Sequence, residues 1–175
     1  MTQENVERLR HSYEAFNRTQ EPELDLWATN VVYIQTADVS AGETVYRGRE
    51  GVAQAIGELT DAFEGLRIEP EEFFDLGDRV LAFVRLRGRA RQSGVAVDAC
   101  FGHVATFRGS EIVRWQAFAR REEALEAARM GEWRAGSVRP WTRRGFRWLP
   151  SSVVERARRA SGGWSGLARR ASRRR

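Results

Sequence analysis

The stretch Cys100–Phe118, CFGHVATFRGSEIVRWQAF, decides the fold that the sequence predicts. Apolar and polar residues alternate on both sides of Gly109-Ser110, a dipeptide that favours a tight turn. This pattern is typical of two antiparallel strands joined by a short loop. We therefore expect a hairpin whose strands cover residues 95–107 and 112–119.

Two further strands are predicted before this hairpin. From residue 66 onward the hydrophobic period is two residues, and a turn is expected at Gly77-Asp78. On the first of these strands, Ile68, Phe74 and Leu76 are expected to share one face. Together with the hairpin they predict an antiparallel meander of four strands.

Helical periodicity dominates the residues before the meander. Apolar residues recur at helical spacing over 4–17 and over 46–59. Between them we expect a short helix that begins at Pro22, with Leu24, Trp27 and Ala28 as its apolar residues. A short strand is expected over 31–35. A last helical segment is expected over 121–129. Because most helices precede the sheet instead of alternating with its strands, the order indicates an α+β fold.

The charge of the chain changes sign near residue 131. Residues 1–130 carry a net charge of −6, whereas residues 131–175 carry +11, with 13 arginines and four of the six tryptophans. We expect residues 1–130 to form one domain and residues 131–175 to be a flexible basic tail. Arginine with interleaved tryptophan suits an anionic membrane or a nucleic acid. A merely solvated tail or a mistranslated coding region explains the same composition.

Histidine and cysteine are too few for common metal sites. Cys100 is the only cysteine, and His11 and His103 are the only histidines. Neither a disulfide framework nor a thiolate-rich zinc site can be built, and we expect Cys100 to be an inert buried thiol. Sequence motifs for dinucleotides, phosphates and serine hydrolysis are missing. We expect no metal and no cofactor, and the charged N-terminus favours a cytoplasmic protein.

The closing hairpin and the order of elements, over about residues 4–126, resemble the SnoaL-like and ketosteroid-isomerase-like domains of the nuclear transport factor two-like superfamily. The resemblance implies a cone of three N-terminal helices packed on a strongly curved, mainly antiparallel sheet, followed here by the basic extension. It also implies one apolar pocket inside the cone and a homodimer formed through the sheet.

The resemblance extends to individual residues. In ketosteroid isomerases a tyrosine and a sheet carboxylic acid donate hydrogen bonds to the substrate oxyanion, while an aspartate moves the proton. By their places in LRHSYEAF and FGHVATF, the tyrosine corresponds to Tyr13 and the sheet acid to His103. The aspartate corresponds to Gln35. Since an amide cannot act as a general base, Gln35 is expected only to orient the substrate.

His103 is the best catalytic candidate that the sequence offers. Apolar neighbours disfavour an imidazolium, which leaves a neutral imidazole for acid or base work near pH 7, with Tyr13 as hydrogen-bond donor. The alternative is that both residues are structural. His103 would then be half-buried and satisfied by Tyr13 or a backbone carbonyl, and Tyr13 would pack in the core with its hydroxyl at the rim. The residues expected to line the pocket beside Gln35 are Trp27, Phe101, Trp115 and Ala117.

A second catalytic arrangement of this superfamily, the Asp, Arg, Asp set of the epoxide hydrolases, has no matching motif. Arg85, Arg87 and Asp98 could still converge from neighbouring strands. We expect the cone to bind a small hydrophobic or polyketide-like molecule, with isomerisation, cyclisation or dehydration as candidate reactions. The alternative is a binding or dimerisation module without catalysis, with the tail as a tether to anionic surfaces.

Overall fold

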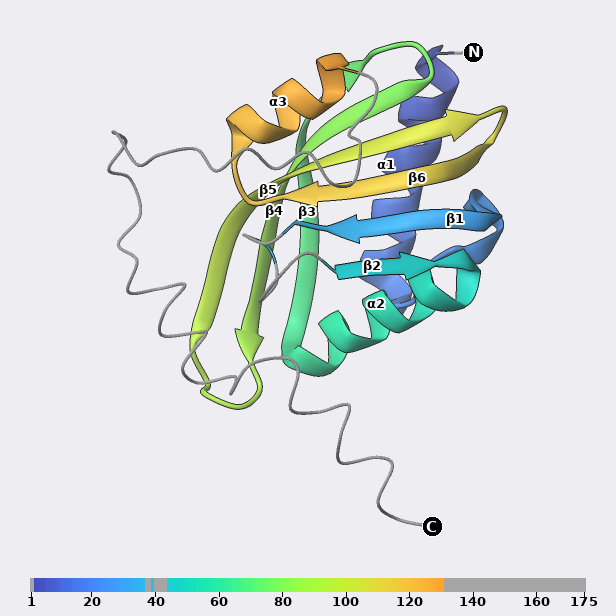
Figure 1. Ribbon diagram of the computed structural model, residues 1–175. Coiled ribbons are helices and arrows are strands. Elements are labelled where there is room, and N and C mark those ends of the chain that lie inside the picture. Colours follow the sequence, from blue (N-terminus) through green and yellow to red (C-terminus); the bar gives the residue numbers. More distant parts are fainter. Residues whose placement is uncertain (1, 37–38, 40–43, 131–175) are drawn as a thin grey trace.

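The computed structural model describes residues 2–36, 39 and 44–130 (Figure 1). The tail, residues 131–175, lies outside the described residues, so the predicted division into two parts stays a prediction. The helices are α1 (Thr2–Thr19), α2 (Gly48–Ala62) and α3 (Arg121–Met130), with one 3-10 turn, η1 (Leu24–Leu26). The strands are β1 (Trp27–Gln35), β2 (Thr44–Arg47), β3 (Phe63–Asp75), β4 (Arg79–Ala90), β5 (Ala96–Arg108) and β6 (Glu111–Phe118).

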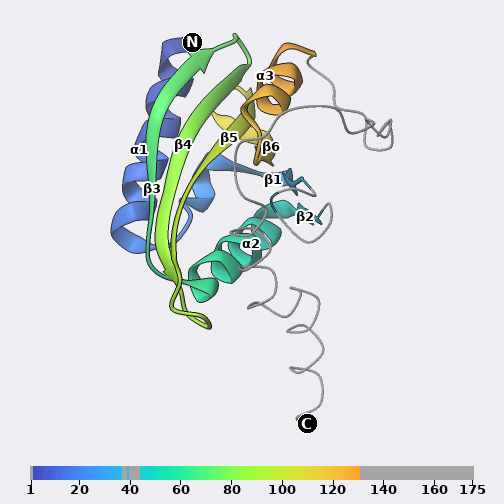
Figure 2. The same cartoon turned by 90° about the vertical axis from the view of Figure 1, so that its left-hand side faces the viewer.

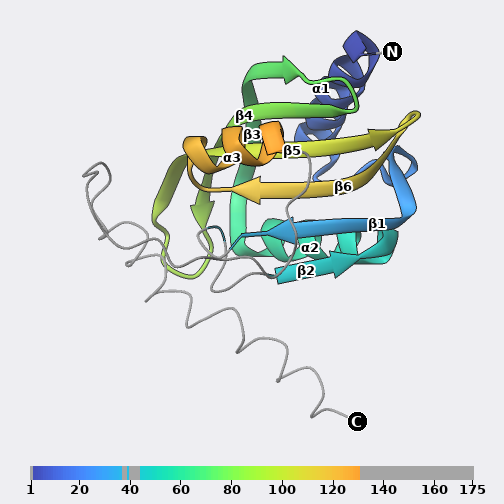
Figure 3. The same ribbon diagram turned by 45° about the horizontal axis from the view of Figure 1, so that its top comes forward.

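The six strands form one sheet in the order β2-β1-β6-β5-β4-β3 (Figure 3). Strand β1 runs parallel to β6, and every other pair of neighbours in this sheet is antiparallel. The long strands β3, β4 and β5 curve strongly along their length (Figure 1). The predicted α+β class and the four-stranded meander β3 to β6 are confirmed.

Each face of the sheet buries its own hydrophobic cluster. On the inner face, α1 and α2 contribute Leu9, Phe16 and Val52 to the larger cluster. On the outer face, α3 packs Ala124 and Ala128 against a smaller cluster that includes side chains of β4, β5 and β6. Figure 2 shows α1 and α3 on opposite sides of the long strands. The cone interior is therefore the space between the sheet, α1 and α2.

The prediction of a short helix from Pro22 is wrong, because this segment forms only the single 3-10 turn η1. Trp27 and Ala28, expected on that helix, begin β1 instead. Trp27 pairs with Ile112 of β6, and its carbonyl oxygen accepts a hydrogen bond of 2.6 Å from Nε of Arg49. Pairing with a strand more than eighty residues away along the chain overrides the local helical pattern. Two of the three helices consequently precede the long strands, and α3 follows them.

The face expected for the end of β3 is also wrong, because the strand contains an irregularity. The register with β4 shifts between Pro70 and Glu72, which leaves one extra residue in β3. An extra residue reverses the alternation of faces beyond it. Phe73 therefore packs against the inner cluster, while Phe74 is 38% exposed.

The free edge of β3 is covered by side chains from the end of α1. Asn17 donates a hydrogen bond to the carbonyl of Ile68 at 2.8 Å and accepts one from its amide at 2.9 Å, as a neighbouring strand would. Gln20 donates to the carbonyl of Leu66 at 3.1 Å. Pro70, which has no amide hydrogen, lies farther along the same strand. These features protect the edge from pairing with another chain.

Candidate functional site

Tyr13 and His103 meet inside the cone, as the sequence predicts. The Tyr13 hydroxyl lies 2.9 Å from Nδ1 of His103, and the two rings stack with centroids 6.0 Å apart. Tyr13 faces inward because it shares the apolar side of α1 with Leu9 and Phe16. His103 faces inward because it alternates along β5 with Gly102 and Val104, which belong to the outer face.

Small side chains flank His103 on the inner face of the sheet. Ala82 of β4 and Ala117 of β6 are its direct neighbours across the strands. Gln35 of β1 lies next to Ala117 in the same row. His103 and Gln35 are half-buried, whereas both alanines are buried. The predicted residues His103, Ala117 and Gln35 therefore lie in one row, in which the alanines add little bulk beside the imidazole.

An aromatic cluster surrounds the pair on the side of β1 and β6. Trp115 lies at its centre, with ring centroids 4.9 Å from His103, 5.3 Å from Trp27 and 6.3 Å from Tyr13. Tyr33 stacks on Trp115 with an interplanar angle of 14°. The predicted wall residues Trp27 and Trp115 are thus part of the packed interior.

Phe101 and the lower half of the cone form a less closed wall. Phe101 is half-buried and precedes His103 by two residues on the same face of β5. Partly buried side chains of α2 and β5 pack against the inner cluster in the same way, among them Ile56, Leu59 and Val97. The inner cluster is therefore bordered on this side by apolar side chains that are only partly buried.

Burial keeps both members of the pair neutral at pH 7. Desolvation lowers the pKa of His103 to about 3 and raises the pKa of Tyr13 well above its usual value. One of the two groups donates the hydrogen bond between them. If Tyr13 donates, Nε2 of His103 carries the proton and is the remaining donor of the pair. If Nδ1 of His103 donates, the Tyr13 hydroxyl remains a donor and Nε2 becomes an acceptor. Either way the pair offers one hydrogen-bond donor.

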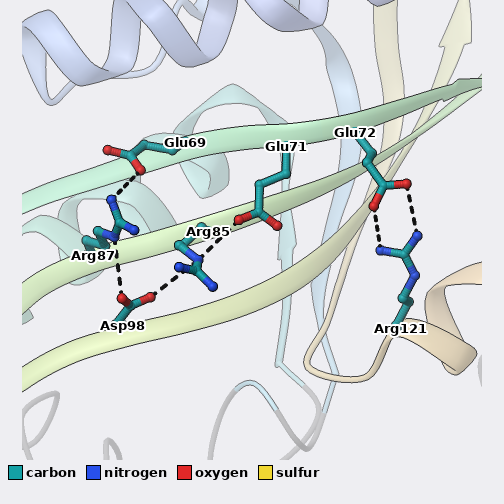
Figure 4. Close-up of polar contacts among 7 residues, drawn as sticks. All are labelled: Glu69, Glu71, Glu72, Arg85, Arg87, Asp98 and Arg121. Carbon is teal, nitrogen blue, oxygen red and sulfur yellow. Dashed lines mark hydrogen bonds and ion pairs between the residues drawn. The ribbon is translucent and has the colours of Figure 1, made fainter.

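The charged set Arg85, Arg87 and Asp98 does converge, but on the outer face (Figure 4). Asp98 lies 3.5 Å from Nε of Arg85 and 3.4 Å from Nε of Arg87, and its side chain is 56% exposed. These residues alternate with the core residues of β4 and β5, so they point away from the cone. The epoxide-hydrolase arrangement is therefore not formed in the interior.

Cys100 is exposed, which corrects the expectation of a buried thiol. It pairs directly with Arg85 across β4 and β5, on the outer face. A free cysteine without a nearby histidine is usually an inert buried thiol. Here α3 packs on the outer face near Gly102 and Val104, farther along β5, and leaves Cys100 exposed.

Two residues near the pair were missed from the sequence. Tyr33 lies in the strand that was predicted, and its alternation with Gln35 would have placed it on the inner face. Burial raises the pKa of Tyr33 to about 12. Phe73, whose ring centroid lies 6.3 Å from that of Tyr13, was assigned to the wrong face because the β3 irregularity has no sequence signal.

Other features of the described residues do not enter this site. A surface groove of about 400 Å³ lies near the C-terminal ends of α1 and α2, and neither Tyr13 nor His103 lines it. Within residues 2–36, 39 and 44–130, no group of three or more His, Cys, Asp or Glu side chains is arranged to hold a metal ion. Among the same residues, no helix is long and apolar enough to span a membrane.

A curved sheet closed by helices around an aromatic interior, with one polar pair inside, defines a small α+β cone. Residues 9–115 match the SnoaL-like domain family, and the chain belongs to that family. A comparison with curated proteins finds no match.

Solved structures with the same fold are similar to this chain at low sequence identity. One is an NTF2-like protein of unknown function from Burkholderia pseudomallei, with a TM-score of 0.60 and 22% identity over 72% of this chain and 98% of that chain. TerC, co-crystallised with polyporic acid, gives a TM-score of 0.58 and 22% identity over 71% of this chain and 98% of its own. A candidate SnoaL-like polyketide cyclase from Jannaschia sp. CCS1 gives a TM-score of 0.58 and 18% identity over 73% of this chain and 92% of that chain.

Proposed function

We propose that the cone binds a small, mostly apolar molecule that carries a carbonyl group, and that Tyr13 and His103 transfer a proton within it. The observation that carries this proposal is the 2.9 Å contact between Tyr13 and His103 in an interior that is mostly apolar and aromatic. Ligand pockets of this kind combine apolar walls with a few convergent polar groups. The co-crystallisation of TerC with polyporic acid supports a small-molecule ligand.

The proposed step moves a proton from the carbon next to the carbonyl to Nε2 of His103. In this arrangement Nδ1–H of His103 donates to the Tyr13 oxygen, and the Tyr13 hydroxyl donates to the carbonyl oxygen as negative charge develops there. The proton returns from Nε2 to another carbon of the same molecule, or to an oxygen that leaves as water. These outcomes correspond to isomerisation and dehydration. Because desolvation lowers the pKa of His103 to about 3, the imidazole is a weak base, and the Tyr13 hydrogen bond is essential to the step.

The test uses 2-acetylnaphthalene, a flat ketone with exchangeable protons on its methyl group. In D₂O the protein is expected to accelerate exchange of these protons by about 10²-fold or more over buffer, as general acid–base catalysis usually does. Proton NMR of the acetyl methyl signal measures the rate. Tyr13→Phe is expected to lose most of the acceleration, since it removes only the hydroxyl.

His11→Gln is the matched control, because His11 is the other histidine and its side chain is 62% exposed. It is expected to exchange like the wild type. Binding of the ketone without any acceleration of exchange would favour the binding module and reject the proton-transfer step.

A non-catalytic module that pairs through the sheet remains the second candidate. The outer face is covered by α3 at one end and exposes Arg87, Asp98 and Cys100 at the other. Ion pairs between Arg87 and Glu69, at 2.8 Å, and between Arg85 and Glu71, at 3.1 Å, make the exposed part rich in both charges (Figure 4). A second copy with the same alternation offers complementary charges to such a surface.

The predicted tail contact with anionic surfaces rests on the 13 arginines of residues 131–175. The full chain is expected to bind vesicles with acidic lipid or single-stranded DNA at low salt, and binding is expected to fall steeply as salt rises because counterions are released. Co-sedimentation measures binding to the vesicles, and fluorescence anisotropy measures binding to the DNA. A chain that ends at residue 130 serves as control, and equal binding by both chains contradicts the prediction.

A further inference from the structure

Two large apolar side chains are exposed on the outer face of the sheet, where β3 ends. Phe74 and Leu76 are each 38% exposed. The Phe74 ring meets the ring of Phe83, a member of the outer cluster, edge to face with centroids 5.9 Å apart. Leu76 lies two residues farther along, at the turn into β4. Neighbouring exposed apolar side chains mark interaction surfaces more often than isolated ones do.

One side of α3 extends this apolar surface. Arg121 donates two hydrogen bonds of 3.0 Å to Glu72 of β3, so this side of the helix faces β3 (Figure 4). Leu125 follows Arg121 by four residues and therefore lies on the same side. A groove of about 420 Å³ lies here, and its lining on α3 consists of Glu122, Leu125, Glu126 and Arg129. We call this groove, together with Phe74 and Leu76, the α3–β3 groove.

Carboxylates outnumber arginines around the α3–β3 groove. Glu122 and Glu126 are exposed, and neither forms an ion pair with another of the described residues. Asp75, at the end of β3, is exposed as well and accepts a hydrogen bond from the amide of Gly77. On α3, Arg129 is the cation that lines the groove. Since complementary charge guides association, a positively charged occupant fits this surface.

The chain itself continues into such an occupant from this place. Nη1 of Arg79, beside the turn between β3 and β4, donates a hydrogen bond of 2.5 Å to the carbonyl oxygen of Ala128. The C-terminal end of α3 therefore lies next to this turn (Figure 1). The sequence that follows α3, GEWRAGSVRPW over 131–141, carries Trp133, Arg134, Arg139 and Trp141. At about 3.3–3.6 Å per residue, it is long enough to return along the whole of α3.

We propose that residues 131–141 dock in the α3–β3 groove, with Trp133 against its apolar side chains and Arg134 and Arg139 against its carboxylates. The contact covers exposed apolar surface and pairs carboxylates that have no partner among the described residues. It makes the first part of the tail a part of the domain and leaves the arginines from Arg143 onward for anionic surfaces. The groove lies on the outer face, so the inference is independent of the proposed function inside the cone.

Limited digestion of the full chain with trypsin tests this contact. Trypsin cleaves after Arg134 when the segment is released, whereas Pro140 protects the bond after Arg139. A synthetic peptide of residues 131–141 gives the cleavage rate of the Arg134 bond without docking. In the full chain we expect cleavage about tenfold slower or more, since proteolysis follows the population of the released state. The difference is expected to shrink toward about 1 M salt, which screens the ion pairs. Mass spectrometry measures both rates.

Two changes in the groove are each expected to remove most of the protection: Leu76→Ser, and Glu122→Gln combined with Glu126→Gln. The matched controls are Val95→Ser and Glu14→Gln. Val95 is 43% exposed at the opposite end of β4, and Glu14 is exposed on α1, on the other side of the sheet. Both controls are expected to be cleaved like the wild type. Circular dichroism spectra and melting temperatures verify that all variants fold.

Each outcome decides the inference. Cleavage of the wild type at the rate of the peptide would overturn the docking of the tail. Protection that survives in both groove variants, or that the controls lose as well, would overturn the α3–β3 groove as the docking site. Protection that does not depend on salt would overturn the role of the carboxylates. Protection that grows with protein concentration would assign the groove to the tail of a second copy and overturn docking within one chain.

Discussion

Gly102→Ala is expected to destabilise the protein by about 1–3 kcal/mol, the usual cost of overpacking a core. A Cβ atom at Gly102 would lie 2.3 Å from Cβ of Ala124 on α3. The same atom would lie 3.3 Å from the ring of Phe83. Because Gly102 is in the middle of β5 and α3 is packed directly on it, the helix must move outward to accept the methyl group. Urea denaturation followed by circular dichroism measures the free energy of unfolding.

Ala124→Gly combined with Gly102→Ala tests whether this contact is the cause. Removing the Ala124 methyl group costs about 1 kcal/mol by itself through helix propensity. In the double variant the clash is gone, so its loss of stability is expected to be smaller than the sum of the two single losses, by about 0.5–3 kcal/mol of coupling. Strict additivity would contradict the close approach of α3 to β5.

Acid is expected to destabilise the protein through His103. The unfolded chain binds a proton at His103 near pH 6.5, whereas burial holds the folded pKa at about 3. The contribution of His103 to the free energy of unfolding is therefore fully present above pH 6.5. It is lost as the pH falls toward 3, because in this range only the unfolded state takes up the proton. Between pH 7 and pH 5 this single group is expected to cost about 2 kcal/mol. Urea denaturation at several pH values measures the slope.

Two variants isolate the contribution of His103 to this slope. His103→Asn is expected to lower stability at pH 7, since Tyr13 loses its partner, but to flatten the dependence between pH 7 and pH 5. His11→Gln is expected to keep the slope of the wild type, because the His11 side chain is 62% exposed. An unchanged slope in His103→Asn would mean that His103 is not held neutral by burial.

The meander and the meeting of Tyr13 with His103 could be predicted because they depend on local periodicity. Alternation along β5 fixes the face of His103, and helical spacing from Leu9 to Phe16 fixes that of Tyr13. Each signal lies within one element and survives small errors in its boundaries. The resemblance to SnoaL-like domains then related the two elements across 90 residues.

The features that were missed depend on contacts between distant segments. The start of β1 at Trp27 reads as helix, and it is strand because β6 lies beside it. The irregularity of β3 after Pro70 follows from its pairing with β4 and carries no local signature. The exposure of Cys100 depends on where α3 ends its coverage of the outer face. Short-range patterns carry no information about any of these contacts.

The parallel pairing of β1 with β6 determines the order in which the cone can be completed during synthesis. Strand β1 ends at Gln35, but its parallel partner β6 ends only at Phe118 and is synthesised much later. Until β6 leaves the ribosome, β1 has only the four-residue strand β2 beside it. The sequence of β1, WATNVVYIQ, is rich in residues that favour strands. It therefore lacks a stable partner strand while more than eighty further residues are synthesised. Such a delay makes folding slow and leaves an aggregation-prone strand exposed, so the nascent chain has a window in which chaperones are most useful.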